Sequence, residues 1–368
     1  MDSRLSACRG CLLGLGVGDA MGYTVDEKTW EEIQEDYGPN GLLGYDLVNG
    51  CAEASSYTQV AAYVANALLI GITRGKYEQQ SRFVALALRE WARSQHFPRD
   101  PEKSYCWVCK MPQMRKRKCK DARMLDALRM ETLGTPERPV NRTATAGGLT
   151  GAAMVGLSYD GKYMQPHQVG ILGAQTVALT HGSHLAYLSG CVLSNCIAGI
   201  LQEPDLPLEE QFTHAIDAME NQFRATVACM DEVSSILRKA IDLAKQEQEN
   251  PRQVMEDFYS RDAHQCLAAA MYACLTCPED FDSAMILAVN HSGRSAAVGA
   301  LTGAILGAKL GVEALPEFYL ESLECGDVLE ALAADFAVGS PVSGLFNDDW
   351  DHKYIQGLPL GMEIAEKV

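Results

Sequence analysis

Long stretches of small and apolar residues alternate with short polar turns along this chain. The clearest stretch is residues 295–311, which are almost entirely Ala, Gly, Val, Leu, Thr and Ile and have almost no polar face. A helix that is apolar all round lies inside a protein, and its small residues let neighbouring helices approach its backbone. We therefore expect a central buried helix, preceded by the polar turn His291-Ser292-Gly293-Arg294-Ser295.

The first turn of this helix is expected to point into the middle of the fold. Unpaired N–H groups and a partial positive charge at a helix N-terminus favour an anion, a hydroxyl-rich ligand or a polar network. The alternative is a central packing helix that the polar turn only caps. The pattern leaves both interpretations open.

Apolar positions at helical spacing predict at least ten helical segments in the whole chain. Residues 4–22 form one, and Asp19 near its end must find a hydrogen-bond donor or a cation. Another, with Ser55 or Ser56 as its N-cap, continues for about five to six turns. The remaining expected helical regions are 79–95, 122–133, 140–157, 165–202, 208–247, 264–277 and 281–290. Period-two alternation is nearly absent, so the fold class is all-α.

Composition limits the classes of protein to which the chain can belong. Its 368 residues contain no Pro/Gly/Ser-rich linker, so we expect one domain over 1–368. A net charge of −17 argues against general nucleic-acid binding and against an anionic membrane surface. Thirteen cysteines, many of them single and in apolar context, indicate a reduced protein, and the opening residues do not form a signal peptide. We expect a cytoplasmic location.

Five stretches resemble, in the same order, the ADP-ribosylglycohydrolase family, whose all-helical enzymes remove ADP-ribose from arginine, serine or other acceptors with a paired magnesium site. They are GCLLGLGVGDAMG at 10–22, YTQVAAYVANALL at 57–69, LTHGSHLA at 179–186, AVNHSGRSAAVGALTGAILGA at 288–308 and LPEFYLESLE at 315–324. The resemblance covers about residues 8–335. It implies a compact orthogonal multi-helix bundle.

The family's functional motifs are altered at the matching positions. Its first metal motif, Thr-Asp-Asp-Thr, falls on Ser-Ser-Tyr-Thr at 55–58, and its second, Asp-(Ser/Thr)-Asp-(Ser/Thr), falls on Arg-Ser-Ala-Ala at 294–297. The family's Gly-Asn-Gly-Ala-Leu-Met-Arg loop falls on residues 145–151, and the glutamate after its opening Gly-Asp signature falls on Asp26. All four metal-motif carboxylates are therefore missing.

Magnesium prefers an octahedron of oxygen ligands, usually with carboxylates that balance its charge. Hydroxyl groups at 55–58 lack that charge. At contact distance, and with an effective dielectric constant near 20, Arg294 would repel a dication by roughly several kcal/mol. We therefore predict that the magnesium pair is lost. Arg294 can instead pair with Asp19, Asp26 or an anionic ligand. The alternatives are that Arg294 turns outward to a surface carboxylate and that Tyr57 fills the cleft.

These positions define the candidate site. For a hydrolysis without metal, Asp26 is the candidate general base and Arg294 the charge stabiliser. The candidate ligand-binding residues are Asp19, Ser55, Ser56, Tyr57, Gly147, Gly148, His291, Ser292, Gly293 and Ser295. The histidines at 181, 184 and 291 are expected to be hydrogen-bonded structural residues and not bases.

An insertion at about 98–123 is absent from the family pattern. Cys106, Cys109 and Cys119 are candidate ligands of a structural zinc ion, with His96 or a distant cysteine as the fourth. The basic segment Lys110–Arg123 can dock on an acidic partner, bind phosphate or neutralise an acidic face of its own chain, and the last is the commonest role of a charge run. The tail at about 338–368 also departs from the family.

Three hypotheses of function follow. The first is a pseudoenzyme or binding module that uses the residual cleft for an ADP-ribose-like ligand or its surface for a partner. The second is a metal-independent hydrolase that acts on an ADP-ribosyl or related N- or O-glycosidic bond. The third is a structural role, since some lens crystallins reuse this fold.

Overall fold

The computed structural model describes residues 3–97, 104–162, 164–339 and 348–355. This part of the chain contains 17 α-helices and no strand beyond isolated bridges, which confirms the all-α prediction. The helices are α1 Ser3–Val25, α2 Trp30–Tyr37, α3 Ser56–Thr73, α4 Gln80–Ser94, α5 Ala122–Arg129, α6 Leu149–Leu157, α7 Pro166–Ala178, α8 His184–Gln202, α9 Leu208–Phe223, α10 Asp231–Ala244, α11 Pro251–Asp257, α12 Ala263–Thr276, α13 Phe281–Val289, α14 Ser295–Leu310, α15 Glu317–Glu321, α16 Gly326–Val338 and α17 Asp348–Tyr354.

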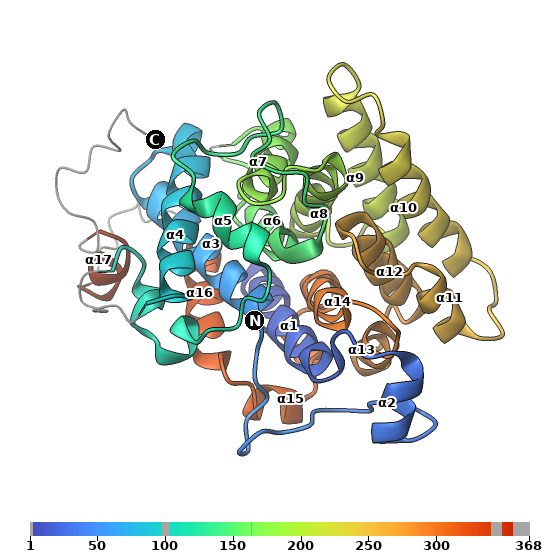
Figure 1. Cartoon of the computed structure of the whole chain (residues 1–368). Helices are drawn as coiled ribbons and strands as arrows, with labels where there is room; N and C mark the ends of the chain where they lie inside the picture. Colours follow the sequence, from blue (N-terminus) through green and yellow to red (C-terminus); the bar gives the residue numbers. More distant parts are fainter. Residues whose placement is uncertain (1–2, 98–103, 163, 340–347, 356–368) are drawn as a thin grey trace.

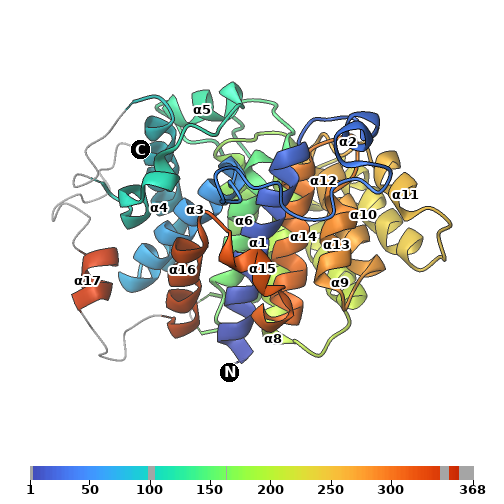
Figure 2. The same ribbon diagram turned by 90° about the horizontal axis from the view of Figure 1, so that it is seen from below.

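Helices α1 and α14 lie side by side at the centre of the molecule (Figures 1 and 2). Residues four positions apart lie on the same face of a helix, and the facing stripes of both helices consist mainly of glycine. Gly14 and Gly303 are so close that a Cβ atom on either would overlap the backbone carbonyl of the other. The two helices therefore meet backbone to backbone, and the predicted central helix is confirmed.

The other helices surround this pair. Helix α3 packs on α4, α6 and α16, whereas α12 and α13 pack on α14. Helices α6, α7 and α8 pack on one another, and α9 to α11 form the side farthest from α4 and α17 (Figures 1 and 2). Among the described residues, only α8 is long and apolar enough to cross a membrane, and most of it is buried among its neighbours. Burial of this kind is typical of a core helix.

Several boundaries differ from the predicted ones. Helix α2 was not predicted because its sequence, WEEIQEDY, is acidic and buries only Ile33, although Thr29 and Glu32 form a capping box at its start. The region 208–247 divides into α9 and α10, and α16 and α17 were also missed. Residues 98–103 of the insertion and 340–347 and 356–368 of the tail lie outside the described residues.

Candidate ligand-binding cleft

A buried carboxylate fixes the first turn of α3. Asp19, fully buried in α1, accepts hydrogen bonds from the backbone N–H groups of Ser55 and Thr58 at 2.9 and 3.0 Å and from both hydroxyls at 2.5 Å. Burial raises the pKa of Asp19, and the hydrogen bonds from Ser55 and Thr58 oppose that rise. The residues at the first metal motif therefore bind a carboxylate of their own chain. Asp19 does not pair with Arg294, which was one of the three predicted pairings.

A second polar group closes the start of α14. The Arg294 guanidinium is 2.5 Å from a Glu27 carboxylate oxygen and 4.0 Å from one of Asp26. Asp26 accepts a hydrogen bond from the backbone N–H of Ala296 at 3.2 Å, so it caps the first turn of α14. Burial raises the pKa of Asp26 to about 6, although Ala296, Arg294 and Lys120 lower it. Of the predicted partners, Asp26 lies near Arg294, whereas the closest partner, Glu27, was not predicted.

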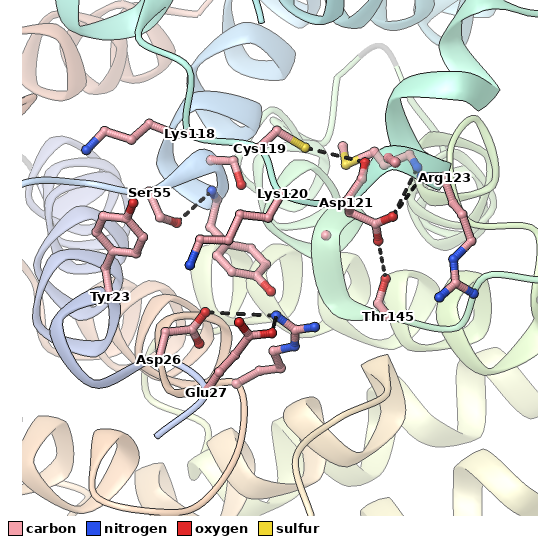
Figure 3. Close-up of a pocket in the computed structure, with 16 residues that line it drawn as sticks. Tyr23, Asp26, Glu27, Ser55, Lys118, Cys119, Lys120, Asp121, Arg123 and Thr145 are labelled. Atoms are coloured by element: carbon pink, nitrogen blue, oxygen red, sulfur yellow. Dashed lines mark hydrogen bonds and ion pairs between the residues drawn. The ribbon is translucent and has the colours of Figure 1, made fainter. Parts of the chain in front are cut away.

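Ser55, Asp26, Glu27 and Arg294 from these two groups line one cleft of about 360 Å³ (Figure 3). Its lining residues are Tyr23, Asp26, Glu27, Ser55, Ser56, Tyr57, Lys118, Cys119, Lys120, Asp121, Ala122, Arg123, Met124, Thr145, Gly147 and Arg294. Of the predicted site residues, the structure thus brings together Asp26, Arg294, Gly147 and the three consecutive residues 55–57. Tyr57 lines the cleft but does not fill it, and Arg294 keeps one third of its side chain exposed (33%).

The other predicted ligand-binding residues lie behind the lining. The Ser292 hydroxyl donates to Glu256 at 3.2 Å and accepts from the backbone N–H of Trp30 at 2.8 Å. Ser295 donates to the His291 carbonyl at 3.3 Å, and the Gly293 carbonyl accepts from the Glu27 N–H. Burial lowers the pKa of His291 to about 4. Like Asp19 and Gly148, these groups position the cleft without lining it.

A chain of hydrogen bonds connects the cleft to the core. Asp121 accepts from the Thr145 hydroxyl at 3.0 Å, the same hydroxyl lies 3.1 Å from His181 Nε2, and His181 Nδ1 lies 2.7 Å from the Thr180 hydroxyl. Burial lowers the pKa of His181 to about 4, so its ring is neutral at physiological pH. His181 also packs beneath Gly147, where a Cβ atom would be 3.0 Å from the ring. This arrangement fits a structural histidine.

The basic insertion forms one wall of this cleft, which the sequence pattern did not locate. Lys116 pairs with Glu324, and the Lys118 ammonium lies 2.9 Å from Glu53 and 5.0 Å from the centre of the Tyr23 ring. These two lysines neutralise acids of their own chain, which is one of the three roles considered. Seven lining residues come from the insertion and the start of α5, and none of them was predicted to line the cleft; the only available signal was the local density of positive charge.

The candidate zinc site is not formed. Cys106 and Cys109 are fully buried beside α3 and α4, whereas the Cys119 thiol lies 3.7 Å from the Asp121 carbonyl. Burial raises the pKa of all three thiols. No three His, Cys, Asp or Glu side chains gather as metal ligands within the described ranges. Both cysteines of the C-x-x-C motif are buried, and all thirteen cysteines are free thiols.

Comparison with known proteins decides the family. The family model described as ADP-ribosylglycohydrolase matches residues 1–344. The chain belongs to the ADP-ribosylglycohydrolase family. A solved structure titled "ADP-ribosylglycohydrolase-related protein complex" has the same fold, with a TM-score of 0.59 and 23% identity over 92% of this chain and 99% of that one. No curated protein matches.

The paired magnesium site expected for an ADP-ribosylglycohydrolase does not fit the donors present in this chain. The hydroxyls of Ser55 and Thr58 already donate to Asp19, and neither carries a charge. Asp26 and Glu27 face the Arg294 guanidinium, which would repel a dication at the same place. The residues available are thus neutral hydroxyls and carboxylates beside a fixed cation, and a pair of dications has no adequate ligand set.

The raised pKa of Asp26 leads to a stability prediction. The folded protein holds the Asp26 proton up to about pH 6, whereas the pKa of the free side chain is 3.8. Stability is therefore lost as pH rises between these values, and the loss persists above them. Asp26→Asn keeps an acceptor for the Ala296 N–H, so we expect it to raise the free energy of unfolding at pH 7.5 by about 1–3 kcal/mol, taking about 1.4 kcal/mol per pKa unit.

Urea unfolding at pH 7.5 and pH 4 tests this prediction. The gain should disappear at pH 4, where Asp26 is protonated and resembles asparagine. Asp205→Asn, at an exposed position outside the cleft, is the matched control and should leave stability unchanged at both pH values. A variant at position 26 that is less stable than the wild type at pH 7.5 would contradict the prediction.

Proposed function

We propose that this member of the ADP-ribosylglycohydrolase family lacks the magnesium pair and is catalytically silent or nearly so. We propose that its cleft binds an ADP-ribose-like small molecule. The observation that carries the proposal is the position of Arg294. The family resemblance assigns this position to a metal-binding carboxylate, and here a guanidinium lies within ion-pair distance of Asp26 and Glu27. We further propose a single domain and a cytoplasmic location, in keeping with the free thiols.

A fixed guanidinium supports ligand binding in the absence of metal. Arginine presents several N–H donors in a planar arrangement that suits phosphate and carboxylate groups, and it stays charged at any physiological pH. In this cleft Glu27 and Asp26 hold it in place, and one third of its side chain remains open to solvent (33%). The open part is available to a ligand, whereas the carboxylates can accept hydrogen bonds from ribose hydroxyls.

A second function, hydrolysis without metal, is favoured by one specific observation. Asp26 has a pKa raised to about 6 by burial, and it lies on the cleft 4.0 Å from Arg294. A carboxylate with a pKa near the working pH suits a general base, and a neighbouring guanidinium can stabilise developing negative charge. In this hypothesis Asp26 removes a proton from water as the water oxygen bonds to the anomeric carbon and the glycosidic bond breaks. Arg294 stabilises the negative charge that develops on the leaving group, and Asp26 then returns the proton to it.

Ligand binding and turnover separate the two functions. In thermal unfolding of the full chain, ADP-ribose at about 100 times its Kd should add about 2.7 kcal/mol of stability, equally with magnesium and with EDTA. Arg294→Gln should weaken this stabilisation, whereas Arg238→Gln, which changes a surface ion pair on α10, should not. Arginine- and serine-linked ADP-ribose should remain uncleaved.

Each other outcome has a defined meaning. Magnesium-dependent release of ADP-ribose would overturn the proposal of a metal-free protein. Release of ADP-ribose that does not depend on magnesium but is lost in Asp26→Asn would establish the metal-independent hydrolase. No stabilisation by ADP-ribose or any nucleotide would overturn ligand binding and favour a structural role.

A further inference from the structure

Two cations on the insertion wall of the cleft are not neutralised by an ion pair in the described part of the chain. Lys118 pairs with Glu53 and Arg294 pairs with Glu27, so both of these lining cations are neutralised. Lys120 and Arg123 also line the cleft, yet no ion pair or side-chain hydrogen bond to either is formed by the described residues. The ring of Tyr23, 5.8 Å from the Lys120 ammonium, is its one aromatic neighbour.

The backbone that carries these two cations is held in place. The Gln95 side-chain oxygen accepts hydrogen bonds from the backbone N–H groups of Lys118 and Cys119 at 3.0 and 3.2 Å. Asp121 caps α5 by accepting from the N–H groups of Arg123 and Met124 at 3.0 and 3.3 Å, and its second oxygen accepts from Thr145. Both oxygens of Asp121 are therefore engaged, and the carboxylate does not pair with either cation.

The two walls of the cleft differ in net charge, although Asp121 lies between the two cations of the insertion wall with both of its oxygens already hydrogen-bonded. Asp26 and Glu27 lie on the wall built by the end of α1, whereas Lys120 and Arg123 lie on the insertion wall (Figure 3). Figure 3 shows the Lys120 side chain extending across the cleft toward Asp26, and the two are close enough for Lys120 to lower the pKa of that carboxyl. An anionic group would be repelled by the α1 wall and attracted by the insertion wall.

We infer that Lys120 and Arg123 form a phosphate subsite, so that the cleft takes a small molecule whose phosphate or diphosphate lies on the insertion wall and whose uncharged sugar hydroxyls face Asp26 and Arg294. This inference rests on the proposed function and specifies the ligand class and its orientation. Charge-assisted N–H···O contacts from an ammonium and a guanidinium are the usual way in which proteins hold phosphate. In a chain with a net charge of −17, two cations without an ion pair in one cleft are a local exception that a phosphate would neutralise.

Calorimetric titration of the full chain with inorganic pyrophosphate, ADP-ribose and adenosine tests the subsite. We expect Lys120→Gln and Arg123→Gln each to raise the Kd for pyrophosphate and for ADP-ribose by about tenfold, and the double variant by about a hundredfold, as loss of charge-assisted contacts implies. Wild-type binding should weaken as salt rises, and this dependence should be smaller in the double variant. Adenosine, which has no phosphate, should bind equally to all variants.

Arg129→Gln is the matched control, because Arg129 is on the same short helix as Arg123 but outside the cleft, 3.0 Å from Asp126. It should leave every Kd unchanged, and Arg123→Lys should recover part of the loss.

If the double variant binds pyrophosphate as tightly as the wild type, or if the wild type does not bind it, the subsite is overturned. ADP-ribose binding that survives in the double variant would overturn the subsite but leave the proposed function standing. Pyrophosphate binding without ADP-ribose binding would support the subsite and overturn the proposed ligand.

Discussion

Gly303→Ala is expected to lower the free energy of unfolding by about 3 kcal/mol or more, the upper part of the range for overpacked cores. The added Cβ would overlap the carbonyl oxygen and carbon of Gly14 and approach the backbone nitrogen of Leu15. Alanine favours a helix over glycine by only about 1 kcal/mol, so the overlap outweighs this gain. Because the obstacle is backbone, no side chain can rotate away, and the central helices must separate.

Thermal and urea unfolding measure this loss, which is large beside the total stability of about 5–15 kcal/mol that is usual for domains. Gly326→Ala is the control, because Gly326 is also helical but has no atom nearer than 3.8 Å to its added Cβ. That variant should be neutral or more stable by up to about 1 kcal/mol. Equal stability of the Gly303 variant and the wild type would show that α1 and α14 do not meet as described.

Asp19→Ala is expected to cost about 3 kcal/mol or more and to loosen the start of α3. Its carboxylate accepts hydrogen bonds from two backbone N–H groups and two hydroxyls, all from Ser55 and Thr58. Each buried donor left without an acceptor costs about 1–3 kcal/mol, and the sum exceeds what is recovered by removing a buried charge with a raised pKa. Since Ser55 and Ser56 line the cleft, binding of ADP-ribose should weaken together with stability.

Urea unfolding of the variants measures the effect. Asp19→Asn should fall between wild type and Asp19→Ala, because the amide oxygen can serve part of the four donors while its N–H groups cannot. Ser56→Ala is the control for stability: Ser56 is next to Ser55, but its hydroxyl takes no part in the Asp19 network. A fully stable Asp19→Ala protein would mean that this network contributes little to the fold.

The apolar pattern was sufficient to predict the core of the fold. Residues 295–310 have no polar face and a stripe of small residues, so the interior position of α14 followed from local composition alone. An N-cap of α3 at Ser55 or Ser56 followed from the residue types at a polar-to-apolar boundary, and the structure places Ser55 there. Helix α2 escaped prediction because a short acidic helix that buries one residue has little apolar periodicity.

The loss of the metal-motif carboxylates was also visible in the sequence, because it depends on which residue types occupy four positions. The contacts that the residues at these positions make instead were not visible in the sequence. Asp26 reaches Ala296 across 270 residues of chain, and Ser55 reaches Asp19 across 36. Local periodicity carries no information on such pairings, which depend on how α1, α3 and α14 pack.

The sequence by itself thus determined an all-helical family member with a small-residue centre and altered metal motifs, because helix periodicity and residue identity are local properties. Only the tertiary structure decided that Arg294 faces Glu27 and Asp26, that the three zinc candidates do not meet, and that Lys120 and Arg123 line the same cleft as Ser55. The physical reason is that an insertion is positioned by contacts with distant residues, such as the hydrogen bond from the Cys119 N–H to the Gln95 side chain and the ion pair of Lys118 with Glu53.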